Sequence, residues 1–242
     1  MSTITKAKTV GELAAENPAA TRIFEDLGID YCCGGALTLE DACRAHGVAV
    51  ERVRESLARA AEARQNVAPD RQWSSAALAD LIAHIQDTHH QYTRGALERL
   101  EPLFEKVCAV HGARHAELAG MQEIFAGLAQ ELSMHLMKEE RVLFPYIVRM
   151  EEAVLEKSAI LPAPFGPVEN PVAMMVHEHD DAGQALRALR AESNDYTAPA
   201  DACTSFRALY QGLAELEADL HQHIHLENNI LFPRTIEMER AH

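Results

Sequence analysis

The sequence predicts an all-α protein, with a small helical domain at the N-terminus and a four-helix bundle in the C-terminal part. Three observations support this prediction. Apolar residues recur at helical spacing over long stretches after Trp73. No useful length of the chain alternates with the period of a strand. Four long helical segments are separated by short breaks, and this arrangement is typical of a bundle.

Two domains are expected, one over residues 1–66 and the other over residues 73–242. The change of pattern falls at RQNVAPDRQ, residues 64–72, which is interpreted as the linker. The first domain contains about sixty residues, so the hydrophobic core that it can form is a marginal one. The second domain is large enough for a full bundle core.

The first domain is predicted to consist of short helices. Asn17 is a candidate N-cap, and Pro18 then occupies the first helical position, where a missing N–H group does no harm. Thr38 and Asp41 stand three residues apart and resemble a capping box, which would start a helix near residue 39. Residues 48–64 supply a further amphipathic helix.

The bundle helices are expected over about residues 76–110, 117–156, 172–192 and 203–239. The second break, LPAPFGPVENP, contains four prolines, which do not fit inside a helix. The third break is NDYTAPADA. The first of these helices carries an apolar stripe, which consists of Leu78, Ile82, Ile85, Tyr92, Ala96, Leu103 and Val107.

Composition excludes several function classes. The formal net charge is −15 with histidine neutral, and no basic stripe offsets it, so nucleic acid is not expected as a partner. The N-terminus carries no apolar run typical of a signal peptide, and no segment is long and apolar enough to span a bilayer. A cytoplasmic protein without a membrane partner is therefore expected. The five cysteines follow neither a disulfide framework nor a CxxC zinc pattern, and are interpreted as reduced thiols.

Two segments of the bundle repeat one another. HLMKEERVLFP (residues 135–145) and HIHLENNILFP (residues 223–233) share the pattern H-x-x-x-E-x-x-x-L-F-P and begin 88 residues apart. His90 precedes the first segment by 45 residues, and His179 precedes the second by 44. The chain is therefore interpreted as two helix pairs, in each of which one helix supplies a histidine and the other an H-x-x-x-E motif.

The spacing within this motif indicates a metal site. Residues four apart on a helix lie one above the other, so His135 with Glu139, and His223 with Glu227, can each present an imidazole and a carboxylate to one point. Such groups are costly to bury unpaired in a bundle core, whereas metal ions bound by them remove that cost. Nitrogen and oxygen donors without thiolates favour iron or manganese over structural zinc.

The histidines of the first helix in each pair are less well defined by the pattern. His179 is favoured over His177, because the residues three, four and seven positions beyond it are small or apolar. In the first helix the apolar stripe passes through His89, whereas the repeat spacing favours His90. The other histidines considered are interpreted as solvated or hydrogen-bonded side chains, namely His46, His111, His115, His221 and His242.

These motifs, together with DYCCGG at residues 30–35 and VHEHDDAG at residues 176–183, resemble the Repair of Iron Centres family. This family of di-iron iron–sulfur cluster repair proteins, of the ScdA/YtfE type, is a branch of the hemerythrin-like proteins. The resemblance covers nearly the whole chain. It implies a site of two non-haem iron ions with bridging carboxylates, and its ligand set falls on His90, His135, Glu139, His179, His223 and Glu227.

The resemblance also implies further roles. It favours His90 over His89, makes Glu139 and Glu227 the bridging carboxylates, and matches Glu131 and Glu178 to acidic positions that line access to the metals. Oxygen-carrying hemerythrins have a further histidine at the position of Gly183. A pure oxygen carrier is therefore less expected than a labile or reactive di-iron centre.

The function implied is repair of iron–sulfur clusters damaged by nitric oxide or oxidative stress, by supplying iron, by removing nitric oxide, or both. Damaged iron–sulfur proteins would be the partners, and NO or O₂ the small ligands. Two alternatives stay open, namely an enzyme that reduces nitric oxide at the two irons and a reversible sensor of O₂ or NO. The oligomeric state is also open, with a homodimer among the options.

The adjacent thiols of Cys32 and Cys33 have two interpretations. They are either small buried side chains beside two glycines that end a helix, or reactive thiols. A lasting disulfide between adjacent residues would be strained. Because the metal site is complete without them, we expect a mobile thiol arm that passes electrons, iron or NO between the di-iron site and a client protein.

Overall fold

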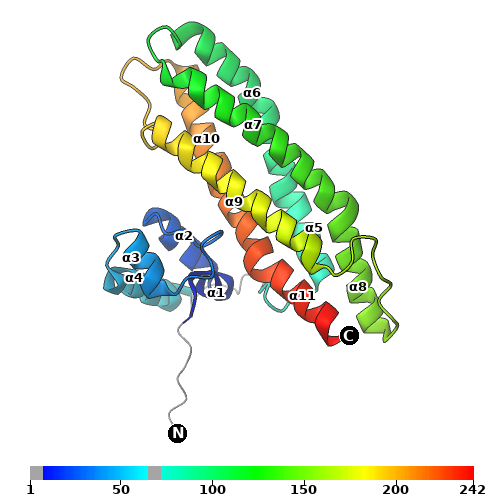
Figure 1. The fold of residues 1–242 in the computed structure, drawn as a ribbon. Coiled ribbons are helices and arrows are strands. Elements are labelled where there is room, and N and C mark those ends of the chain that lie inside the picture. Colours follow the sequence, from blue (N-terminus) through cyan, green and yellow to red (C-terminus); the bar gives the residue numbers. More distant parts are fainter. Residues whose placement is uncertain (1–7, 65–71) are drawn as a thin grey trace. The chain divides into compact units, whose positions relative to one another are not determined.

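The computed structural model of the chain describes residues 8–64 and 72–242, and within these ranges it is all-α (Figure 1). The only strand-like pairing in the described part is an isolated bridge between Thr9 and Thr38. The prediction of a C-terminal four-helix bundle with a small N-terminal helical domain is confirmed. The predicted linker at residues 64–72 falls almost entirely outside the described ranges. No described helix is both long and apolar enough to cross a membrane.

The described residues form two compact units. One contains the chain up to Leu81 together with His221–Ala241, and the other contains Ile82–Leu220 together with His242. The limits of the units lie inside two helices, α5 (Leu78–His84) and α10 (Thr204–Leu226). The predicted domain limits, residues 1–66 and 73–242, stay a prediction.

The N-terminal helices begin where the sequence places caps. The Asn17 side chain accepts a hydrogen bond from the Ala19 N–H at 3.2 Å, and Thr38 Oγ1 accepts one from the Asp41 N–H at 3.2 Å. Each cap satisfies an N–H group that has no partner within the helix. The four helices are α1 (Val10–Glu16), α2 (Pro18–Asp26), α3 (Leu39–Ala45) and α4 (Val50–Arg64).

These short helices enclose a small apolar core of their own. Its largest members, Phe24 and Tyr31, are almost fully buried, and their rings lie 5.9 Å apart. The smaller members include Val10, Ala20, Ile29, Ala42 and Val53. Burial of this apolar surface is the main stabilising contribution in a unit of this size.

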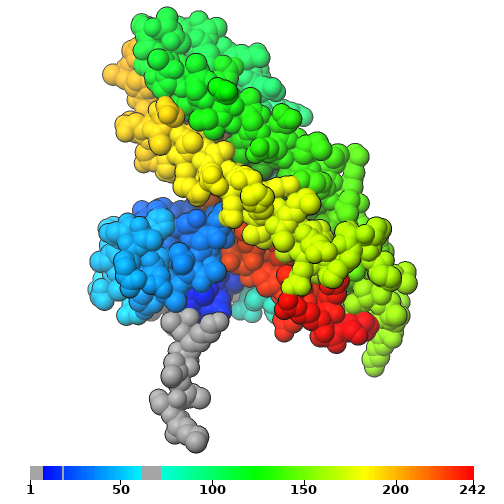
Figure 2. Space-filling model, in the orientation of Figure 1, coloured from blue at the N-terminus to red at the C-terminus, as the bar shows by residue number. Residues whose placement is uncertain are grey.

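The bundle core is supplied by α6 (Gln91–His111), α7 (Glu117–Lys138), α9 (Glu169–Glu192) and α10. In Figure 2, α7 (green) and α9 (yellow) lie side by side along their length. The apolar residues that all four helices contribute to one cluster include Leu100, Phe104, Phe125, Leu128, Leu186, Leu189, Leu213 and Leu216. The helix α9 begins at Glu169 and not near residue 172, because Pro171 fits the first turn, where no N–H donor is needed.

Three of the predicted helices are interrupted by π-helical segments, which the sequence did not predict. They are η1 (Ile85–His90) between α5 and α6, η2 (Glu139–Leu143) before α8 (Phe144–Glu156), and η3 (Glu227–Leu231) before α11 (Phe232–Ala241). Both η2 and η3 begin at the glutamate of the H-x-x-x-E motif and end just before Phe-Pro. Because proline donates no hydrogen bond, a local change of backbone pattern before Pro145 and Pro233 is readily accommodated.

The apolar stripe of the first bundle helix agrees with the prediction at most positions and differs at two. Ala96 and Val107, which lie beyond η1, are buried as predicted. The predicted core positions Tyr92 and Leu103 are only half-buried, whereas their neighbours Thr93 and Phe104 are buried. The predicted stripe is therefore wrong by one residue at these two positions.

Candidate metal centre

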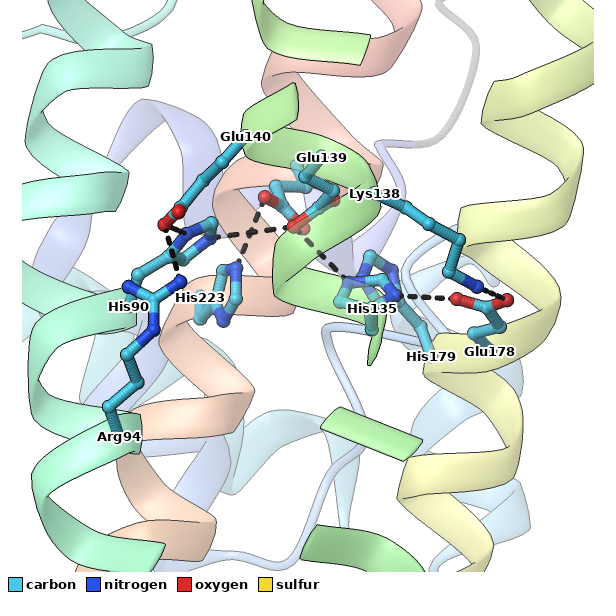
Figure 3. A network of polar contacts seen from close by, with 10 residues as sticks. His90, Arg94, His135, Lys138, Glu139, Glu140, Glu178, His179 and His223 are labelled. Atoms are coloured by element: carbon cyan, nitrogen blue, oxygen red, sulfur yellow. Dashed lines mark hydrogen bonds and ion pairs between the residues drawn. The ribbon is translucent and has the colours of Figure 1, made fainter. Parts of the chain in front are cut away.

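Two groups of four side chains each bring one candidate ligand atom per residue to within 4.8 Å of one another. The first group contains His90 and His223, and the second contains His135 and His179. Both groups also contain Glu139 and Glu227. The structure thus brings together all six residues that the sequence proposed as ligands, and it does so with both carboxylates shared (Figure 3).

All six side chains are deeply buried, and none is more than 3% exposed. Fully buried carboxylates are rare in proteins unless they are paired or bind a metal. The local fold explains their burial, because each glutamate lies at the first position of a π-helical segment, directly after the α-helix that carries its histidine. Such segments are frequent at functional sites.

Glu139 lies between two imidazoles. Its Oε2 is 3.4 Å from Nε2 of His90 and 3.3 Å from Nε2 of His135. The other glutamate has a similar contact, with Oε1 of Glu227 3.1 Å from Nε2 of His223. These Nε2 atoms therefore point to the shared carboxylates.

Two ring nitrogens also face one another in the second group. Nε2 of His179 lies 3.0 Å from Nε2 of His135, within the deeply buried part of the bundle. Two imidazole nitrogens at this distance must share one proton or bind a common cation, since both cannot be protonated donors. The donor set, imidazole nitrogens with carboxylate oxygens, fits a transition-metal ion at this place.

The outer nitrogens of two histidines contact further carboxylates. Nδ1 of His90 is 2.8 Å from Oε1 of Glu140, and Nδ1 of His135 is 2.9 Å from Oε2 of Glu178. A carboxylate at Nδ1 fixes the tautomer so that Nε2 carries a lone pair for a metal. Carboxylates in this position are common behind metal-binding histidines.

Basic residues keep these outer carboxylates ionised. Arg94 lies 2.8 Å from Glu140, and Lys138 forms an ion pair with Glu178. Partial burial acts to raise the pKa of Glu140, but hydrogen bonds from His90 and Arg94 outweigh it and lower the pKa. In the same way, burial acts to raise the pKa of Glu178, and its hydrogen bonds with Lys138 and His135 lower it.

The alternative histidine of the first helix, His89, has a different partner. Its Nδ1 lies 2.9 Å from Asp219, and it belongs to neither group of candidate ligands. His90 is fully buried and its ring stacks on Phe144, with centroids 5.6 Å apart. The segment η1 turns His90 to the centre, although α-helical periodicity alone had favoured His89.

The two acidic residues expected near the metals, Glu178 and Glu131, differ in their distance from the candidate ligands and in their exposure. Glu178 contacts His135 directly, as described above, and is only partly buried. Glu131 is exposed on α7, one turn before His135. Glu140 contacts His90, which spacing within one helix does not predict because the two residues lie on different helices. Its position directly after Glu139 was the available signal.

The two adjacent cysteines lie in a turn organised by Asp30. Its Oδ1 accepts hydrogen bonds from the backbone N–H groups of Cys32, Cys33 and Gly34 at 3.2, 3.0 and 3.0 Å. The two sulfur atoms are 4.0 Å apart, and all five cysteines of the chain are free thiols. The hydrogen bond with Cys33, followed by burial, raises the pKa of Cys32 well above its ordinary value.

The same turn requires glycine at two positions, because other atoms lie where a Cβ atom would be. A Cβ atom at Gly34 would lie 2.8 Å from the Asp30 carbonyl oxygen, and one at Gly35 would lie 2.2 Å from Oδ1 of Asn229. Asn229 belongs to η3, and its Nδ2 donates to the carbonyl oxygens of Tyr31 and Cys32 at 3.2 and 3.3 Å. The turn therefore packs on the segment that carries Glu227, and the glycines do not end a helix.

An all-α bundle with six buried histidine and glutamate residues defines a class, the hemerythrin-like metal-binding proteins. Comparison with known proteins agrees, because the hemerythrin HHE cation-binding domain matches residues 81–235. The N-terminal domain of ScdA, described as a domain of unknown function, matches residues 6–61.

Curated relatives resemble the chain over almost its whole length. It is 38% identical to the iron–sulfur cluster repair protein YtfE of Musicola paradisiaca, over 97% of this chain and 98% of the relative. It is 39% identical to a probable iron–sulfur cluster repair protein of Haemophilus influenzae, over 94% of this chain and 96% of the relative. The chain belongs to this hemerythrin-like family of iron–sulfur cluster repair proteins.

Proposed function

We propose that the centre holds two non-haem iron ions and that the protein repairs iron–sulfur clusters damaged by nitric oxide or oxidative stress. The observation that carries the proposal is that Glu139 and Glu227 belong to both groups of candidate ligands. Two imidazoles with two shared carboxylates in each group correspond to the donor arrangement of carboxylate-bridged di-metal bundles.

Iron is the metal that the donor set and the relatives' names favour together. Mixed nitrogen and oxygen donors without thiolate suit iron or manganese. Two iron ions bound here would supply Lewis-acid and one-electron redox chemistry. The ligands would be His90, His135, Glu139, His179, His223 and Glu227.

Charged residues around the centre orient the histidine ligands and balance charge. Glu140 and Glu178 hold the outer nitrogens of His90 and His135, so that the inner nitrogens face the centre unprotonated. Arg94 and Lys138 balance the charge of these carboxylates. Because Glu178 is only partly buried, we propose that it also lines the access of small molecules to the centre, with Glu131 further out on α7.

The relatives are named for iron–sulfur cluster repair. For this chain we propose that repair proceeds by supply of iron to the damaged cluster, by removal of bound nitric oxide, or by both, with damaged iron–sulfur proteins as partners in the cytoplasm. Cys32 and Cys33 are proposed to assist transfer. The raised pKa of Cys32 implies that the resting form is a thiol, so a transfer role requires the turn to leave its buried position.

Reactivation of a damaged iron–sulfur dehydratase tests the function directly. A nitric-oxide-treated [4Fe–4S] dehydratase is mixed with the iron-loaded protein in the absence of free iron. We expect activity to return, with iron or nitric oxide transferred in proportion to the protein added. The double variant Glu139→Ala with Glu227→Ala should give no reactivation, and Glu123→Ala, at an exposed glutamate of α7, is a matched surface control.

The same assay separates the proposal from its two alternatives. Steady consumption of nitric oxide with an electron donor, without reactivation of the dehydratase, would identify a nitric oxide reductase. Reversible binding of NO or O₂, with neither turnover nor reactivation, would identify a sensor. Either result would overturn the repair function, while the assignment of the six ligands would stand on metal analysis alone.

A further inference from the structure

A second cluster of metal-binding side chains lies at the end of the bundle where α6 joins α7. One ligand atom from each of His111, His115 and Asp201 lies within 4.8 Å of the others. The thiol of Cys203 adjoins this group, with its Sγ 3.1 Å from Nε2 of His111. From the sequence, both histidines are expected to be ordinary solvated or hydrogen-bonded side chains, and their grouping appears only in the structure.

The cluster is assembled from three segments. His111 is the last residue of α6, His115 follows in the turn before α7, and Asp201 and Cys203 lie just before α10. Figure 1 shows the α6–α7 and α9–α10 connections at the same end of the bundle. Ligands from the α6–α7 turn and the α9–α10 loop would join these two connections through one ion.

His111 is a buried histidine whose ring nitrogens are only partly satisfied. It is 4% exposed, and its ring lies 5.2 Å from the fully buried Phe206. Nδ1 of His111 has no hydrogen-bond partner among the residues that the structure describes, and Nε2 contacts the thiol of Cys203. The hydrogen bond between a thiol and a buried imidazole is weak, and a metal ion bound by both groups would stabilise them more.

His115 is oriented as a metal-binding histidine is. Its Nδ1 lies 3.0 Å from Oε1 of Glu117, and its Nε2 points to Asp201 at 3.1 and 3.3 Å from the two carboxylate oxygens. Around zinc, one ring nitrogen commonly contacts a carboxylate while the other binds the ion, and here the nitrogen available to an ion faces Asp201. The ring also packs edge-on against Phe206, with centroids 5.2 Å apart.

We propose that His111, His115, Asp201 and Cys203 form a second metal site, for Zn²⁺, that is separate from the histidine–glutamate centre. His111, His115 and Asp201 already lie together, and the Cys203 thiol contacts His111 but lies outside that grouping. Its approach would complete four donors of the types that zinc prefers in tetrahedral sites. The site is remote from the centre, because the 21 residues of α6, from the residue after His90 to His111 itself, extend about 30 Å. The bound ion braces the two connections at this end of the bundle.

Cobalt(II) is the probe that distinguishes this site, since it reports thiolate ligation by a charge-transfer band. The histidine–glutamate centre contains no thiolate, and Cys32 and Cys33 are removed from consideration by a Cys32→Ser with Cys33→Ser background. In that full-length background, with the histidine–glutamate centre first loaded with iron, we expect one further equivalent of Co²⁺ to give a thiolate band that Zn²⁺ bleaches by competition.

Two single variants in this background decide the result. Cys203→Ser should abolish the thiolate band, and Cys108→Ser, which removes a thiol of α6 that donates to the Leu118 carbonyl oxygen, should leave it unchanged. Persistence of the band in Cys203→Ser, or its absence from the background protein, would overturn the proposal. Absence is the result expected if His115 and Asp201 form only an ion pair.

A further variant tests the orientation of His115 without removing a ligand. Glu117→Gln should weaken Zn²⁺ binding on the order of tenfold, because the carboxylate behind Nδ1 is lost. Iron content at the histidine–glutamate centre should not change in either Cys203→Ser or Glu117→Gln. Unchanged Zn²⁺ affinity in Glu117→Gln, together with loss of the band in Cys203→Ser, would contradict the role given to His115.

Discussion

The bundle contains two contrasting kinds of interior. Around Phe104 and Phe125, whose rings are 5.1 Å apart, the four helices pack apolar side chains with almost no exposure. At the histidine–glutamate centre the interior is equally buried, but it consists of imidazoles and carboxylates. The first kind stabilises the fold by removing apolar surface from water, and the second is costly to bury without a bound cation.

The contrast is also visible in the backbone. The apolar part is built on uninterrupted α-helix, whereas η2 and η3 begin at Glu139 and Glu227. Regular helix presents a regular apolar stripe, while a π-helical segment redirects side chains where a site needs them. Stability and metal binding are therefore assigned to different stretches of the same helices, and each can be changed separately.

The largest expected effect is a loss of iron binding that leaves the fold intact. The double variant Glu139→Ala with Glu227→Ala removes both shared carboxylates, so we expect iron binding to be lost while the helical content stays unchanged. Iron analysis and circular dichroism measure the two quantities. Glu123→Ala, an exposed glutamate of α7, is the matched control and should keep its iron. Full iron content in the double variant would refute the bridging role.

Phe104→Ala tests the apolar interior. Truncation of this fully buried ring should lower the free energy of unfolding by about 3–5 kcal/mol, through lost burial and the cavity left behind. Chemical denaturation measures the change. Leu103→Ala is the matched control, because Leu103 is only half-buried and should cost clearly less. An equal loss at both positions would contradict the difference in burial between Phe104 and Leu103.

A smaller effect is expected at the carboxylates behind the imidazoles. Glu140→Gln and Glu178→Gln keep the shape of the side chain but weaken its hold on Nδ1 of His90 and His135. We expect metal affinity to fall about 10- to 100-fold in each, measured by competition with a chelator. Glu151→Gln in α8 makes the same change at a glutamate outside the candidate centre, and it should leave metal affinity unchanged. Unaltered affinity would show that these contacts do not orient the ligands.

The smallest expected effect is on the stability of the N-terminal helices, outside both kinds of bundle interior. Thr38→Ala removes the side-chain cap of α3, and we expect a loss of about 1 kcal/mol in the stability of the N-terminal unit. Hydrogen exchange of the α3 amides measures it. Iron content should be unaffected, and Thr38→Ser should restore the stability. A loss of iron in Thr38→Ala would show that the cap influences the centre.

Much of this organisation could be predicted from the sequence because it depends on local spacing. In the H-x-x-x-E motifs at His135 and His223, helical periodicity places the histidine and the glutamate on one face. Capping residues and prolines indicate where most of the helices begin and end. The π-helical segments could not be predicted in this way, so the choice between His89 and His90 stayed open on pattern alone. Contacts between distant residues, such as Asn229 with the cysteine turn or His111 with Cys203, leave no local pattern.

The most direct test of the account is iron analysis with Mössbauer spectroscopy on protein purified without oxygen. If Glu139 and Glu227 are shared by two ions, the protein should bind about two irons per chain as a magnetically coupled pair. The coupling should disappear in the variant that lacks both glutamates. Fewer than about one iron per chain, unchanged after reconstitution with Fe²⁺, would contradict a carboxylate-bridged di-iron centre.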